Sequence, residues 1–273
     1  MERKEKVKTF SVIADGDNYT EILHSVASLS ANGDNDLATS VLEAFDTVGE
    51  EGNLTIVEAT GESKYEVERI NGYTVDQGYE ETLKKFSNGF INDRSGTLIG
   101  MENPVVLLYD GIINDTMQIF DALQKLSNYW DETNHPYKNI LLVAHGFSDV
   151  VLGDMHQNWN HPQTINVLPL LTPQTAIRNW RTQFLYDLQA YTGSPVFNPL
   201  NKSIVDLDPK AMTDNNLVTN VECNRFRTSI ISKEDDALIE CRVDELKQQL
   251  KNPESQYEEN DLNVRIGKLT SGI

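Results

Sequence analysis

Two continuous apolar runs, PVVLLY at residues 104–109 and NILLVA at residues 139–144, decide the expected fold. Neither run alternates as a half-exposed strand does, and uninterrupted apolar runs are typical of strands buried on both faces of a sheet. Between them, large apolar side chains recur at helical spacing: Met117, Phe120, Leu123, Leu126 and Trp130. The strand–helix–strand order predicts the α/β class, with a sheet that contains parallel strands flanked by helices.

Further elements are expected on the C-terminal side of this unit. We predict a helix from Phe147 through Met155, a strand over residues 165–168 and a helix over residues 175–191. Two more helices, over residues 233–251 and 255–270, should pack as an antiparallel C-terminal hairpin, because the proline between them ends the first helix.

The N-terminal part reads as a small α+β unit. Apolar residues at helical spacing predict a helix over residues 18–30, and a second one that stops near Gly49. Asp34 or Asn35 can cap the second helix. Residues 54–58 and 65–70 are rich in β-branched residues or alternate with a period of two, so we expect two strands there.

Composition and charge exclude several classes of protein. The chain has 23 Lys and Arg against 42 Asp and Glu, a net charge of −19, which argues against a nucleic-acid partner or an anionic membrane surface. No apolar run approaches the roughly 20 residues of a spanning helix. The charged N-terminus does not resemble a signal peptide, and the two cysteines have no metal-binding or redox spacing. We therefore expect a cytoplasmic protein without a metal site.

One local pattern suggests an enzyme. The buried run ends in His145-Gly146, which resembles the oxyanion-hole loop of an α/β-hydrolase, with Ser148 as the nearest nucleophile. The glycine that should follow such a serine is missing, so a simple strand end is the competing interpretation. The sequence contains no phosphate-binding glycine loop and no His-Glu-x-x-His pair. A hydrolase that uses the His145-Gly146 loop therefore remains the alternative hypothesis for an enzyme. Our main prediction is that the chain contains no catalytic residues.

Several short motifs occur in a fixed order along the chain. They are SANGD at 30–34, VGEEGNLTIVE at 48–58, GYTVDQGY at 72–79 and KLTSGI at 268–273. This ordered set resembles the middle of a group I chaperonin of the GroEL type. The resemblance implies that residues 1–71 are the first segment of the intermediate domain and residues 72–273 the apical, substrate-binding domain. Gly72 and Gly272 match the hinge between them.

The resemblance also implies what a longer parent protein would do. The family's equatorial ATPase domain has no counterpart here, so we expect a fragment that binds no cofactor. The parent would bind ATP and Mg²⁺, form a ring of identical subunits and fold non-native client proteins. Whether the parent uses a co-chaperonin stays open. A further hypothesis, besides the chaperonin and the hydrolase, is a structural module that binds no client.

In this family, client polypeptides bind to a hydrophobic groove between two apical helices. The resemblance maps that groove onto eight residues of this chain: Tyr79, Phe90, Phe120, Leu123, Leu126, Leu152, Met155 and His156. Without the resemblance, the helical spacing of Phe120, Leu123 and Leu126 would predict ordinary core residues.

The chain departs from the family pattern at several points. His156-Gln157 stand where two valines are usual, and about six residues, Glu80 to Lys85, are extra. Gln77 replaces an arginine that forms an inter-subunit ion pair, and Gln174-Thr175-Ala176-Ile177 replaces a Gly-Phe-Gly-Asp loop. These departures suggest an unusual branch of the family, such as a bacteriophage-encoded one.

Overall fold

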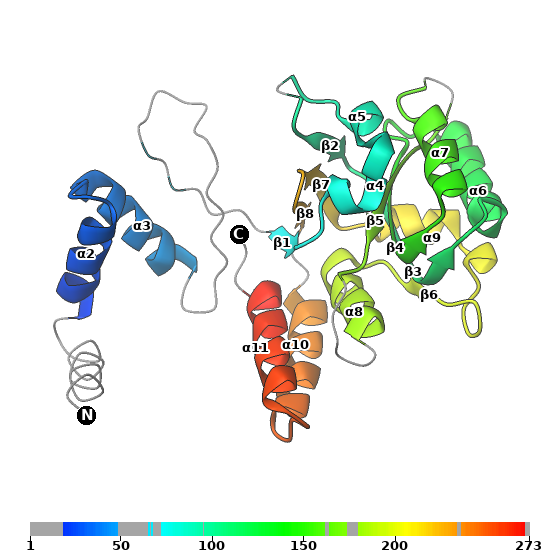
Figure 1. The fold of residues 1–273 in the computed structure, drawn as a ribbon. Helices are drawn as coiled ribbons and strands as arrows, with labels where there is room; N and C mark the ends of the chain where they lie inside the picture. Colours follow the sequence, from blue (N-terminus) through cyan, green and yellow to red (C-terminus); the bar gives the residue numbers. More distant parts are fainter. Residues whose placement is uncertain are drawn as a thin grey trace. The chain divides into compact units, whose positions relative to one another are not determined.

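The computed structural model describes most of the chain: residues 19–48, 65, 67, 72–94, 96–161, 164–173, 180–233 and 236–270. The chain divides into two compact units, residues 1–70 with 271–273, and residues 71–270. Figure 1 shows the elements of both units.

The described part of the first unit is a pair of helices, α2 (Tyr19–Ser30) and α3 (Asn35–Val48). Both predicted helices are confirmed. The Asp34 carboxylate accepts a hydrogen bond from the Leu37 backbone N–H at 3.1 Å, so Asp34 caps α3. The strands predicted over 54–58 and 65–70 lie outside the described residues, apart from Tyr65 and Val67.

A parallel sheet forms the core of the second unit. Its strand order is β5-β4-β3-β6, and every neighbouring pair runs parallel. The strands are β3 (Val105–Ile113), β4 (Asn139–Phe147), β5 (Asn166–Leu171) and β6 (Val196–Phe197). The predicted strand–helix–strand unit is confirmed, because α6 (Met117–Thr133) connects β3 to β4. The apolar runs are buried, and Leu107 and Leu141 are fully inaccessible.

Further helices surround this sheet. They are α7 (Asp149–Asn158), which packs against β5, α8 (Trp180–Thr192), which packs against β3, and the short α9 (Pro209–Asp214), which contacts α6. The predicted helices after Phe147 and over 175–191 are confirmed, although residues 174–179 lie outside the described part. A single 3₁₀ turn, η2 (Ile204–Asp206), precedes α9.

A second, antiparallel sheet was not predicted. Its strand order is β1-β8-β7-β2, formed by β1 (Gly72–Val75), β2 (Ile99–Glu102), β7 (Val218–Cys223) and β8 (Thr228–Ser232). Three short helical pieces separate β1 from β2: α4 (Tyr79–Leu83), η1 (Lys84–Phe86) and α5 (Ser87–Phe90).

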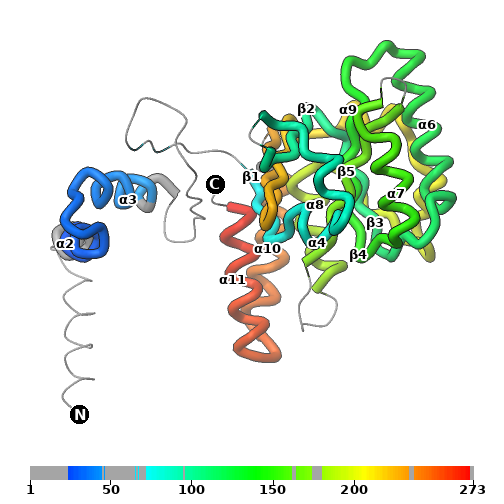
Figure 2. Tube along the Cα trace, turned by 45° about the horizontal axis from the view of Figure 1, so that its top comes forward, coloured from blue at the N-terminus to red at the C-terminus, as the bar shows by residue number. Residues whose placement is uncertain are grey.

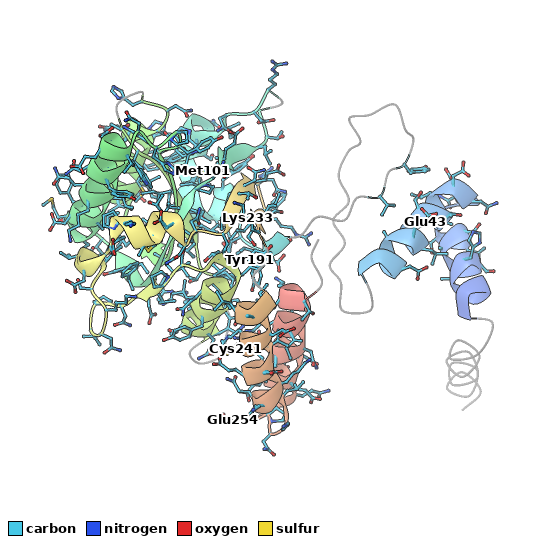
Figure 3. The ribbon with its side chains drawn as sticks, turned by 180° about the vertical axis from the view of Figure 1, so that it is seen from behind. Glu43, Met101, Tyr191, Lys233, Cys241 and Glu254 are labelled. Carbon is cyan, nitrogen blue, oxygen red and sulfur yellow. The ribbon has the colours of Figure 1, made fainter. Side chains whose placement is uncertain are left out.

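The predicted C-terminal hairpin is confirmed. Helices α10 (Asp236–Leu250) and α11 (Gln256–Thr270) pack side by side, and both contact α8 (Figure 2). Glu254 lies in the loop that joins them (Figure 3). None of the described helices is long and apolar enough to cross a membrane.

Candidate functional site

The helices α6 and α7 begin next to each other, where strands β3 and β4 end (Figure 1). The Ser148 hydroxyl caps α7 by accepting from the Val151 N–H at 3.3 Å, and donates to the Asn114 carbonyl at 2.7 Å. One turn further, the Thr116 hydroxyl donates to the Asp154 carboxylate at 2.5 Å. These bonds fix the two helix starts against each other.

Exposed apolar side chains gather at this end of the sheet. We call four of them the apolar rim: Ile112 (52% exposed), Met117 (69%), Phe120 (42%) and Val150 (68%). Ile112 is near the end of β3 and pairs with Gly146 of β4. Met117 and Phe120 lie on the first turn of α6, and Val150 on the first turn of α7. All four side chains therefore belong to elements that begin or end at the same end of the sheet, and large apolar side chains left exposed together are typical of a surface that binds another molecule.

The eight residues predicted to bind polypeptide fall into two groups. Phe90, Leu126, Leu152 and Met155 belong to the hydrophobic core, and none is more than 5% exposed. Phe120 is exposed, whereas Tyr79, Leu123 and His156 are half-buried. The structure therefore leaves only some of the eight accessible to a client, and their role in binding stays a prediction.

The residues predicted from the sequence to bind polypeptide omit three members of the apolar rim: Ile112, Val150 and Met117, which was recognised only by its helical spacing. Ile112 follows Gly111 near the end of a strand, and Val150 precedes the buried Val151. A weak signal existed, because apolar residues at the carboxyl ends of parallel strands lie where open α/β sheets bind ligands. The predicted hinge is described only in part: Gly72 is the first residue of β1, and Gly272 lies outside the described residues.

A hydrogen-bonded cluster surrounds His145 of β4. Its Nε2 lies 2.6 Å from Oδ1 of Asp110, and its Nδ1 lies 3.1 Å from the Thr172 hydroxyl. Asp110 also accepts bonds from the Thr182 hydroxyl at 3.0 Å and the Asn198 amide at 2.8 Å. Burial raises the pKa of Asp110, but the bonds from His145, Asn198 and Thr182 outweigh it, so this pKa lies below its ordinary value.

This cluster does not form a hydrolase site. Both ring nitrogens of His145 already have partners, and the Ser148 hydroxyl is bonded to the Asn114 carbonyl rather than to the imidazole. A catalytic serine needs a base within hydrogen-bond reach. The geometry therefore does not favour the hydrolase alternative. Within the described ranges, no three His, Cys, Asp or Glu side chains are placed to hold a metal ion.

Sequence comparisons identify relatives along nearly all of the chain, although no family model matches it. Chaperonin GroEL 3 of Psychromonas ingrahamii is 29% identical over 259 residues, which cover 93% of this chain and 43% of the relative. Chaperonin GroEL of Wolbachia sp. subsp. Brugia malayi is 27% identical over 259 residues, covering 91% of this chain and 42% of that protein. The chain is therefore similar to a part of GroEL chaperonins, at low identity. It spans less than half of the length of these relatives.

The fold agrees with that result. The chaperonin gp146 from the bacteriophage EL 2 (Pseudomonas aeruginosa), solved in two crystal forms in the presence of ATP-BeFx, superimposes with TM-scores of 0.59 and 0.57 at 19% identity. The match covers 91% of this chain and 45% of gp146. The mixed α/β architecture is therefore a chaperonin fold, as predicted.

Proposed function

We propose that this chain is the client-binding part of a GroEL-like chaperonin and captures non-native polypeptides. In this proposal, residues 72–273 are the apical domain, and residues 1–71 belong to the intermediate domain. Two observations support it: GroEL relatives match 91–93% of the chain, and the fold matches that of a phage chaperonin.

The single observation that carries the proposal is the exposure of the apolar rim. An unfolded polypeptide exposes apolar side chains, and burying them against Ile112, Met117, Phe120 and Val150 removes apolar surface from water on both partners. Such binding needs no particular client sequence, because the hydrophobic effect is non-directional. The net charge of −19 fits this role, since like-charged molecules repel one another and stay soluble despite the exposed rim.

The rest of the chaperonin cycle belongs to the full-length protein. In this proposal, ATP and Mg²⁺ bind to an equatorial domain outside these 273 residues, and identical subunits assemble into a cytoplasmic ring. Nucleotide binding would then move the apical domain about Gly72 and Gly272. A lid co-chaperonin would bind the same rim if this branch uses one.

The experiment that tests this function removes the apolar character of the rim. Met117→Ser with Phe120→Ser should abolish the ability of the chain to suppress aggregation of a chemically denatured protein, while the circular dichroism spectrum stays unchanged. Val264→Ser is the matched control, since Val264 is 57% exposed on α11. Undiminished suppression by the double variant would overturn the rim assignment. No suppression by the wild-type chain would favour the structural-module alternative.

A further inference from the structure

We propose that residues 79–90, which we call the strap, cover one face of α7 and confine client binding to the apolar rim. This inference rests on the proposed function and deepens it, because it states which surface a client can reach. The strap consists of α4, η1 and α5.

The first end of the strap is fixed to the turn between β7 and β8. The Tyr79 N–H donates to the Asn224 carbonyl at 3.0 Å, and the Glu80 N–H donates to the Arg225 carbonyl at 3.3 Å. The Arg225 guanidinium also donates two hydrogen bonds to the Glu80 carboxylate. Its Nε donates to Oε2, and its Nη2 donates to Oε1 at 2.7 Å. Gly78 allows this close approach, because a Cβ there would lie 2.4 Å from the Arg225 backbone.

The middle of the strap is packed onto the edge of the parallel sheet. Leu83 is fully buried, and Thr82 is 2% exposed. The Thr82 hydroxyl accepts a hydrogen bond from the Leu171 N–H of β5 at 3.3 Å, so the strap satisfies a backbone donor at that edge. Burial of the Leu83 side chain removes apolar surface from water and stabilises this arrangement. The strap is therefore part of the folded core and not a loose loop.

The second end of the strap lies along α7. The Lys85 amine is 2.9 Å from the Asp149 carboxylate, and the Phe86 ring lies 5.7 Å from the His156 ring, centroid to centroid. A Cβ at Gly153 would lie 3.7 Å from the tip of the Phe86 ring. The spacing of four and three residues between the α7 partners places them on one face of the helix. The strap thus contacts this face at Asp149, Gly153 and His156.

The contact with His156 is especially close. A Cβ at Gly89 would lie 1.9 Å from Nε2 of His156, so any other residue at position 89 would have to push the imidazole aside. The Phe90 ring also lies close by, 5.9 Å from the His156 ring and 4.9 Å from the Trp159 ring, centroid to centroid. The His156 imidazole therefore packs against the strap, and little of this side chain is left for a client to contact.

A client would have to displace the strap to reach this face of α7. The strap is part of the same chain, so its effective concentration at α7 is on the order of millimolar or higher. At equal intrinsic affinity, a client at micromolar concentration would therefore occupy this face far less often than the strap does. The strap leaves the apolar rim open, at the first turns of α6 and α7 and the end of β3, and we place client binding there.

The test compares Phe86→Ala in the full chain with Tyr257→Ala, a control aromatic that is 82% exposed on α11. Two probes are used: the dye bis-ANS, which reports accessible apolar surface, and reduced carboxymethylated α-lactalbumin, a permanently unfolded protein. Phe86→Ala should bind both probes roughly three- to tenfold more tightly. It should also speed amide hydrogen exchange over residues 149–158. Tyr257→Ala should change neither.

A second pair of variants covers the case in which Phe86→Ala does not fold. Lys85→Glu places a second carboxylate beside that of Asp149 and should loosen the strap. The rise in bis-ANS binding should be smaller than that caused by Phe86→Ala. Adding Asp149→Lys to the Lys85→Glu variant should restore an ion pair and reverse the rise. Unchanged dye binding and unchanged exchange in folded variants would overturn the strap proposal. Dye binding and hydrogen exchange involve no client, unlike binding of the unfolded α-lactalbumin, so these two measurements distinguish failure of the strap from failure of client capture.

Discussion

Arg265 binds both carboxylate oxygens of Asp187: its Nε donates to Oδ2 at 2.6 Å, and its Nη2 donates to Oδ1 at 2.9 Å. Arg242 adds a bond from Nε to Oδ1 at 2.8 Å. The Asp187 side chain is fully buried on α8, whereas the two arginines belong to α11 and α10. One buried carboxylate therefore joins both helices of the C-terminal hairpin to α8.

The first prediction concerns the removal of that carboxylate. Asp187→Ala leaves two nearly buried guanidinium groups without their main partner, and breaking such a cluster costs about 3–5 kcal/mol. Urea unfolding should show a loss of free energy of unfolding of this size. Asp76→Ala is the control, because Asp76 pairs with Arg227 and Lys268 at the surface and is 57% exposed; its loss should cost less than about 1 kcal/mol. Equal losses for the two variants would contradict the account.

The second prediction concerns acid stability. The pKa of Asp110 is lower in the folded chain than in the unfolded one, so its bonds stabilise the fold fully above the unfolded pKa of about 3.9. This contribution is lost as the pH falls through the lower folded pKa. Asp110→Ala should lower the free energy of unfolding by about 2–3 kcal/mol at pH 7. Below about pH 4, the free energy of unfolding of this variant should fall less steeply with pH than that of the wild type. Parallel stability curves for the two proteins over that range would refute this role.

The third prediction separates the two cysteines by their reactivity. Burial raises the pKa of the Cys223 thiol to about 11, whereas Cys241 is exposed on α10 (Figure 3). Since the thiolate is the reactive form, iodoacetamide at pH 8 should modify Cys241 in the folded chain and leave Cys223 intact. In urea, both should react. Mass spectrometry of tryptic peptides measures this, and equal labelling of both cysteines in the folded chain would be the contrary result.

Much of the second unit could be predicted from the sequence. The runs that end at Tyr109 and Ala144 are uninterruptedly apolar because these strands are buried on both faces of the sheet. The antiparallel sheet could not be predicted. Strand β7 reads VTNVEC and buries only Val218, Val221 and Cys223, so its polar residues hide the strand signal. Its stability comes from pairing with β8 and β2, which are distant or weakly patterned in sequence.

The candidate site shows the same limit. Phe120 and Leu126 fall on one helical stripe of the sequence, yet Phe120 is 42% exposed and Leu126 is fully buried. Periodicity identifies the stripe, but only the elements packed against α6 decide which part of it stays open. The strap is a second example: Phe86 meets His156 of α7 through a contact between distant parts of the chain, which no local pattern reveals.

Site-specific photo-crosslinking tests the central claim, client capture at the apolar rim, most directly. A photoreactive amino acid replaces Phe120 in one variant and Val264 of α11, 57% exposed, in another. Each is irradiated with a chemically denatured protein and with the same protein in its native state. The account predicts strong crosslinks from position 120 to the denatured protein alone, and few from position 264. Equal crosslinking from both positions, or none from position 120, would contradict it.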